Sequence, residues 1–257
     1  RVLFVRGGDI YITGGTTGPV NATQSAVPES SPAWSPDGTR WLTASADGTC
    51  QSFMVDGRQP AVVFRGHSRG VSAVCFLPDG QTVVSAGIDQ TLQVWNSQSG
   101  ELRRTLSNHA ASINDVAVKP SDRRTVSAGE NEADAQPGAQ PPLPVVASAS
   151  DDRTVRLWQP TIGRLLRFVK LTSIPRTIAW TRAGACIAVG CDDGTLRVFD
   201  GESLELLESS QLLDGPVYAI ARRPSRDGLG DEFLVAGAGE PRVHRRAVGS
   251  ERGLESK

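Results

Sequence analysis

Residues 66–96, GHSRGVSAVCFLPDGQTVVSAGIDQTLQVWN, contain three short apolar runs that alternate with polar residues and are separated by turn residues. The runs VSAVCF, QTVVSAG and TLQVWN are rich in β-branched residues, and Pro, Asp, Gly and Ser stand between them. This pattern is typical of β-strands joined by tight turns. With the following run, ELRRTL, the stretch predicts a unit of four antiparallel strands. No window of the chain keeps an apolar 3.6-residue period for more than two turns, so no helix is expected.

The same unit recurs along the chain. An apolar residue stands before a Pro or Asp-Gly turn at Trp34, Phe76, Val118 and Trp180, and Arg222 takes the fifth equivalent position. The steps between these five positions are 42, 42, 62 and 42 residues. An Asp in a turn before an alternating run recurs at Asp47, Asp89, Asp152 and Asp193. The long step holds an insertion, about 122–144, whose Pro, Gly, Ala and acidic residues predict a mobile loop. Because such small sheets cannot bury both faces alone, we expect an all-β fold, a β-propeller of four-stranded antiparallel blades.

One copy carries the marks of a known repeat. Gly66 and His67, the turn residue Asp89, and Trp95-Asn96 in the place of a Trp-Asp pair make residues 66–96 resemble the WD40 repeat. The resemblance covers most of the chain; it is strong over 66–106 and 108–169, moderate over 171–210 and weaker at the ends. Residues 31–57 lack the His and have Phe53 at the Trp position. They are more similar to the repeats of TolB-type bacterial propellers, which favours a bacterial source.

We expect one propeller domain over residues 1–257. Its repeats lie near 31–66, 67–106, 108–170, 171–210 and 214–248, with a partial blade over 1–25. The runs RVLFVRG and DIYIT indicate outer strands of a blade whose inner strand is absent. Two alternatives stay open. In one, the N-terminal strands complete the last blade, as rings of this family close, which gives about six blades. In the other, the chain is a fragment of a seven-bladed ring or of a longer protein.

Composition narrows the class of partner. The chain has 27 Lys and Arg against 28 Asp and Glu, a net charge of -1, which disfavours nucleic acid and anionic membranes. No apolar run approaches the roughly 20 residues of a membrane helix. The four cysteines show no CxxC spacing and are expected as free thiols, which favours a reducing, cytoplasmic compartment. Since the first residue is Arg rather than Met, a periplasmic protein with its signal lost upstream is the alternative.

Ser148, His109 and Asp152 are the residue types of a hydrolase triad, but the set occurs twice. Asp follows Ser by four residues and Trp follows Asp by six in both copies, and no GxSxG motif is present. Because a catalytic centre is seldom duplicated in tandem, we expect no enzymatic activity. The WD40 resemblance implies instead two structural hydrogen-bond relays, formed by His67, Ser85, Asp89 and Trp95 and by His109, Ser148, Asp152 and Trp158. The other two copies keep the turn Asp but have Thr43 with Phe53, or Val189 with Phe199, in place of Ser and Trp.

No metal or cofactor is expected. Only three His exist in the chain, and two of them belong to the expected relays. The Gly clusters GGTTG and GAG fall in turns with no helix after them, so they do not predict a phosphate loop.

The resemblance also implies where a protein or peptide ligand would bind. In WD40 propellers the loops before the inner strand and before the third strand form the usual docking face. The expected inner-strand column is Ser30, Ser72, Asn114, Arg176 and Tyr218, and the column just before the turn Asp is Ala46, Ile88, Asp151 and Asp192. The predicted function is a non-enzymatic interaction scaffold, a monomeric ring. The first alternative is a regulatory or substrate-gating propeller of a larger enzyme whose catalytic domain is not in this chain. The second is hydrolytic or small-ligand chemistry in the central channel, where Asn114, Asp115, Arg176 and Tyr218 are the polar candidates.

Overall fold

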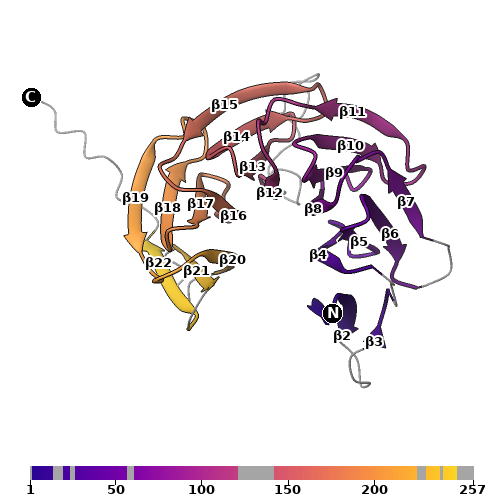
Figure 1. Cartoon of the computed structure of the whole chain (residues 1–257), viewed down its shortest axis with the longest axis horizontal. Helices are drawn as coiled ribbons and strands as arrows, with labels where there is room; N and C mark the ends of the chain where they lie inside the picture. The colour runs from indigo at the N-terminus through magenta and orange to yellow at the C-terminus, as the bar shows by residue number, and fades with distance from the viewer. Residues whose placement is uncertain are drawn as a thin grey trace, which may run out of the picture.

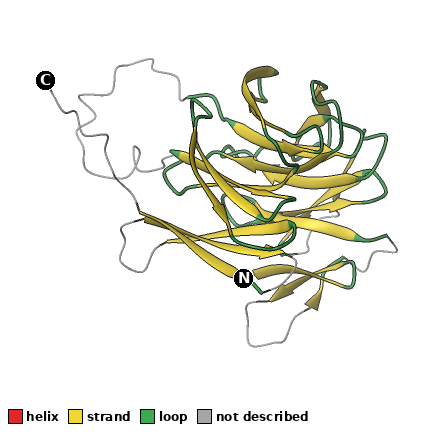
Figure 2. Cartoon of the chain, turned by 60° about the vertical axis from the view of Figure 1, so that its left-hand side comes forward, coloured by secondary structure: helices red, strands yellow, loops and turns green. Residues whose placement is uncertain are grey.

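The computed structural model describes residues 2–13, 20–23, 27–56, 61–120, 142–224, 230–237 and 240–247. Nearly all of the predicted insertion at about 122–144 lies outside these residues. Every regular element in the described part is a β-strand, and Figure 2 shows strands and loops there but no helix. The prediction of an all-β chain without helices is therefore confirmed for the described residues.

Within the described residues six antiparallel sheets follow one another, and we call them blades 1 to 6. Blades 1 and 6 have three strands: β1 (Val2–Arg6), β2 (Asp9–Thr13) and β3 (Val20–Asn21) in blade 1, and β20 (Val217–Pro224), β21 (Gly230–Gly237) and β22 (Arg242–Ala247) in blade 6. Blades 2 and 3 have four: β4 (Glu29–Trp34), β5 (Arg40–Ser45), β6 (Thr49–Met54) and β7 (Val62–Arg65), then β8 (Val71–Phe76), β9 (Thr82–Gly87), β10 (Leu92–Asn96) and β11 (Leu102–Leu106). Blades 4 and 5 also have four: β12 (Ile113–Val118), β13 (Val146–Ser150), β14 (Thr154–Gln159) and β15 (Arg164–Lys170), then β16 (Pro175–Trp180), β17 (Cys186–Cys191), β18 (Thr195–Asp200) and β19 (Leu206–Gln211).

The blades are arranged radially. Figure 1 shows β4, β8, β12, β16 and β20 around the centre and β7, β11, β15 and β19 at the rim, with the arc open between blade 6 and blade 1. This confirms the predicted β-propeller. The arrangement in which the N-terminal strands complete the last blade is wrong, because β1 and β2 pair with each other and with β3 as a sheet of their own. In the described part of the chain β22 pairs with β21 alone, and β21 pairs on its other side with β20.

Neighbouring blades bury their facing surfaces against each other. The aliphatic side chain of Val84 in blade 3 packs in one core cluster with Ile113 and Trp158 of blade 4, and Ala147 of blade 4 packs with Trp180 of blade 5. Small side chains on one sheet thus meet large rings on the next, an interdigitation that fills the space between two twisted sheets at the density of a protein interior. The repeat therefore supplies both halves of every interface from the same short sequence pattern.

This face is left uncovered in blade 6. The residue in the middle of the second strand that points to the next blade is wholly buried in blades 2 to 5, where it is Leu42, Val84, Ala147 and Ala188. Its equivalent in blade 6, Leu234, is 42% exposed. The cross-strand neighbour of Leu234, Val243, is 51% exposed, whereas the matching Val198 of blade 5 is wholly buried. The described residues of blade 6 therefore present a packing face to the opening in the arc.

Candidate functional site

Two buried hydrogen-bond chains connect a Trp to a turn Asp. In blade 3 the indole N–H of Trp95 donates to Ser85 Oγ at 2.8 Å, and that Oγ lies 2.7 Å from Nε2 of His67. Since Ser85 accepts the indole hydrogen, its own hydroxyl donates to Nε2, and the His67 proton is assigned to Nδ1. The Nδ1 atom lies 3.0 Å from Asp89 Oδ1, so the chain ends on a carboxylate. Every donor in this path has an acceptor, as a buried polar group requires.

Blade 4 repeats the arrangement. Trp158 Nε1 donates to Ser148 Oγ at 2.9 Å, Ser148 Oγ lies 2.8 Å from His109 Nε2, and His109 Nδ1 lies 2.8 Å from Asp152. Arg156 adds a guanidinium 3.4 Å from the Asp152 carboxylate. The structure thus brings together all four residues of each set that the sequence analysis grouped.

Electrostatics keep the imidazoles neutral and the carboxylates charged. Burial lowers the pKa of His67 and of His109 below the ordinary value, and the hydrogen bond to the Asp only partly offsets this effect. Burial acts in the opposite sense on Asp89, but hydrogen bonds from His67, Thr91 and the Ser68 N–H outweigh it and lower the pKa of that carboxyl. At neutral pH each relay is therefore a neutral ring between a hydroxyl and a carboxylate.

The geometry of Ser, His and Asp in these chains resembles a catalytic triad, but the serines are badly placed for catalysis. Ser85 and Ser148 are wholly buried, and each Oγ already accepts an indole N–H. A nucleophilic serine has to be reached by a substrate carbonyl and needs an oxyanion hole beside it. The relay geometry therefore suits holding strands together better than acyl transfer.

The turn Asp has a local role that does not need the relay. In blade 2, Asp47 Oδ1 accepts from the backbone N–H and the hydroxyl of Thr49, and in blade 5 Asp193 Oδ1 accepts the same pair of bonds from Thr195. These are the side-chain to backbone bonds that favour Asp in turns. In blade 2 the hydroxyl of Thr43, at the position of the relay Ser, is buried with no hydrogen-bond partner.

The candidate residues of the two predicted loop columns lie at the loop ends of the strands. Four of them form one cluster across blades 4 and 5. Arg176, in β16, donates from Nε to Asp192 at 2.8 Å and from Nη1 to Asp151 at 3.1 Å. Asn114, in β12, donates to the same Asp151 oxygen at 2.9 Å. The side chains of Arg176, Asp151 and Asp192 each remain about one third exposed. We call these four residues the polar cluster; it carries one positive and two negative charges.

The remaining candidates divide into exposed residues and residues that bond to the backbone. Ile88 is 38% exposed in the turn before Asp89, and Tyr218 is 64% exposed on β20; Ala46 is exposed as well. Ser72 donates to the carbonyl of Ile113 on the next inner strand, and Asn114 donates to the carbonyl of Pro175 at 2.9 Å. Ser30 donates within its own blade to the Ala44 carbonyl at 3.4 Å. Ser72 and Asn114 thus link consecutive blades.

Asp115, on the inner strand β12, forms hydrogen bonds to the next blade. It was a polar candidate for the central channel, but one carboxylate oxygen accepts from the Thr177 hydroxyl and the Ile178 N–H of the next blade, each at 2.9 Å. Burial raises the pKa of this carboxyl to about 6. The sequence held one signal of this role. Asp115 is a carboxylate on an inner strand, whereas the equivalent residues of the other repeats are Ala73, Thr177 and Ala219.

The described residues include no group of three or more His, Cys, Asp or Glu side chains placed to hold a metal ion. Within the same part of the chain no helix is long and apolar enough to cross a membrane.

Comparison with known protein families finds matches in four segments of the chain. A family model described as "WD domain, G-beta repeat" matches residues 12–53, 58–96, 139–159 and 171–200. Together the four matched segments cover about half of the 257 residues and include both relay Asp and Trp pairs.

Proposed function

Because the chain belongs to the WD40 repeat family, whose propellers generally act as protein-interaction scaffolds, we propose that it is a non-enzymatic scaffold that binds a protein or peptide through its loop face. The loop face is the surface formed by Ile88, the polar cluster and Tyr218. The observation that carries this proposal is that exposed side chains occupy these loop positions in four consecutive blades, with a polar cluster joining blades 4 and 5.

The composition of the loop face supports recognition of a protein surface. An exposed aliphatic side chain from blade 3 and an exposed Tyr from blade 6 flank the polar cluster of blades 4 and 5. Tyr and Arg are enriched where binding energy concentrates, and an apolar contact beside a polar one supplies both affinity and orientation. The two carboxylates hold the Arg176 guanidinium in one direction, so little side-chain freedom is lost when a partner binds.

The charge of the polar cluster indicates the partner's chemistry. Two carboxylates around one guanidinium leave an excess of negative charge on this surface. A partner that places a cationic side chain near Asp151 or Asp192 and an apolar one near Ile88 or Tyr218 would complement it. The rest of the chain does not add a general attraction, since the net charge is only -1.

The test is affinity capture from an extract of the source cells, comparing wild type with a variant that carries Ile88→Glu and Tyr218→Ala. Both side chains are exposed, so the variant is expected to fold, and a thermal melt checks this. The matched control carries Leu206→Glu and Phe168→Ala, an exposed aliphatic and an exposed aromatic residue on the rim strands β19 and β15. Proteins that wild type and control retain, and the loop-face variant loses, support the proposal. Equal retention by all three contradicts it.

A further inference from the structure

A second surface feature lies at the opposite ends of the strands from the loop face. A groove of about 490 Å³ opens between blades 4 and 5. It is bordered by Lys119, which follows β12, by Val145, which precedes β13, and by Gly201 and Glu202 in the turn between β18 and β19. The loop-face residue Asp151 follows the other end of β13, so the two surfaces are separated by the length of a strand. A volume of this size is within the range of ligand sites and can hold one or two side chains.

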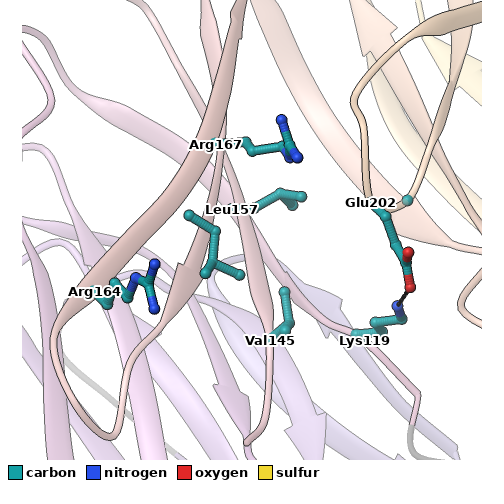
Figure 3. A pocket seen from close by; sticks show the side chains of 8 residues that line it. Lys119, Val145, Leu157, Arg164, Arg167 and Glu202 are labelled. Atoms are coloured by element: carbon teal, nitrogen blue, oxygen red, sulfur yellow. Dashed lines mark ion pairs between the residues drawn. The ribbon is translucent and has the colours of Figure 1, made fainter.

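The walls of the groove differ in charge. Its floor is apolar and consists of Leu157, Leu166 and Val145. Arg164 and Arg167 project from separate points along β15 (Figure 3), and both are exposed. Within the described part of the chain neither guanidinium has an ion-pair partner.

On the other wall of the groove the positive charge of Lys119 is already paired with a carboxylate. Lys119 Nζ lies 3.7 Å from Glu202 Oε1, the pair drawn with a dashed line in Figure 3, and the Glu202 side chain is 87% exposed. Hydrogen bonds from the backbone N–H groups of Ser203 and Glu202 lower the pKa of the nearby Asp200, and the charge of Lys119 adds a smaller effect in the same direction. The uncompensated charge of the groove is therefore the pair of guanidiniums on β15.

A carboxylate is the group that two such guanidiniums recognise best, because Arg presents parallel N–H donors in a planar fork. A polyanion such as nucleic acid fits poorly, since the Glu202 carboxylate also borders the groove and the floor is apolar. An acidic peptide with an aliphatic side chain complements both the arginines and the floor.

We propose that this groove binds a short acidic segment of a partner protein, with one aliphatic side chain on the Leu157, Leu166 and Val145 floor and flanking carboxylates on Arg164 and Arg167. This binding is independent of the loop face, so a partner could occupy both surfaces. The arginines are exposed, Val145 and Leu166 are half-buried, and Leu157 is buried at the base of the groove.

The experiment uses fluorescence anisotropy with the full chain and a fluorescein-labelled peptide, Asp-Glu-Leu-Asp-Glu. The comparison peptides are Asn-Gln-Leu-Asn-Gln, which lacks the charge, and Asp-Glu-Ser-Asp-Glu, which lacks the aliphatic group. We expect wild type to bind the first peptide at least about tenfold more tightly than either of the others, with affinity falling as salt is raised.

Protein variants locate the site. Arg164→Gln with Arg167→Gln is expected to weaken binding of the first peptide by about tenfold or more. The control, Arg103→Gln with Lys170→Gln, removes the same charge from exposed positions on rim strands and is expected to leave binding unchanged. The Ile88→Glu, Tyr218→Ala variant is also expected to bind the peptide normally, which separates this proposal from the loop-face proposal.

Three results would overturn the inference. The first is equal affinity for charged and neutral peptides, and the second is equal loss in the groove variant and in its control. The third concerns the acidic residues of the chain itself at 130, 132 and 134. If changing these to Gln, Gln and Asn is needed before the peptide binds, the occupant of the groove is the chain's own segment and not a partner.

Discussion

Asp89 and Asp152 each end a chain of hydrogen bonds that begins at a buried indole N–H. Replacing either by Ala leaves the His Nδ1–H and two backbone N–H groups without their acceptor. We expect Asp89→Ala to lower the free energy of unfolding by about 1 to 3 kcal/mol, the usual cost of an orphaned buried partner. Urea denaturation measures this loss. Asp47→Ala, which removes a turn Asp that has no His partner, is the control and is expected to cost less; equal losses would refute a role for the relay in stability.

The Asp115 carboxyl makes stability depend on pH in the opposite sense from the relay carboxylates. Its pKa is about 6 in the folded protein against 3.8 as the ordinary value, so between these values the folded state binds more protons than the unfolded state. Its contribution to stability is therefore complete below about pH 4 and is lost as pH rises through 6. We expect the stability difference between wild type and Asp115→Asn to change between pH 4.5 and pH 7.5, with wild type losing stability relative to the variant.

The control for this measurement is Asp37. Hydrogen bonds from Ser35 and Thr39 lower its pKa to about 2, so it is ionised in both states over the same pH range. The stability difference between wild type and Asp37→Asn is expected to be constant from pH 4.5 to pH 7.5. A constant difference for Asp115→Asn as well would contradict the burial of a titrating group between blades 4 and 5.

Among the elements, the turn that connects the second and third strands has the same backbone geometry in blades 2 to 5, but the residue at its left-handed position differs. The residue after the turn Asp has a positive φ in blades 2 to 5, where it is Gly48 (φ 88°), Gln90 (71°), Arg153 (63°) and Gly194 (81°). A side chain in this left-handed region costs about 1 to 2 kcal/mol. At Gly194 an added Cβ would also clash with the Leu213 carbonyl oxygen, so only Gly fits there.

The same geometry predicts a stabilising change. Gln90→Gly removes the strain of a side chain at positive φ in the folded state. Gly also raises the conformational entropy of the unfolded chain, which offsets part of this gain, so we expect the free energy of unfolding to rise by about 0.5 kcal/mol. The matched change Gln81→Gly, at a turn residue without positive φ, is expected to destabilise by about 0.5 to 1 kcal/mol. Thermal unfolding of the two variants checks the difference in sign.

At the scale of the whole molecule, the arc of blades has a covered interior and an uncovered end. Val198 and Val243 occupy the same position in blades 5 and 6, yet the first is wholly buried and the second is 51% exposed. Val198→Thr places a hydroxyl between two blades and is expected to cost about 1 to 3 kcal/mol. Val243→Thr is expected to stay within about 0.5 kcal/mol of wild type. Similar losses in the two variants would show that the face of blade 6 is covered in solution.

The strands, their turns and their grouping into blades followed from the sequence because the information is local. Period-two alternation, β-branched residues and Asp or Gly turns recur at steps of 42 residues, with one longer step of 62, and each blade pairs its strands in the order of the chain. The N-terminal strands were harder to place. Their pattern indicates strands, but whether they pair with β22 or form their own sheet depends on contacts between the two ends of the chain, which no local pattern specifies.

The candidate residues show the same division. Repeat spacing showed that the Ser, His, Asp and Trp set occurs twice, and the WD40 resemblance implied the relays and the two loop columns. Only the tertiary structure decided that Ser72 and Asn114 bond to the next blade, that Arg176 lies between Asp151 and Asp192, and that Ile88 and Tyr218 stay exposed. It also created the groove beside Arg164 and Arg167, whose walls come from two blades. The physical reason is that the sequence sets each strand and turn through its neighbours in the chain, whereas contacts between blades depend on how separate sheets pack.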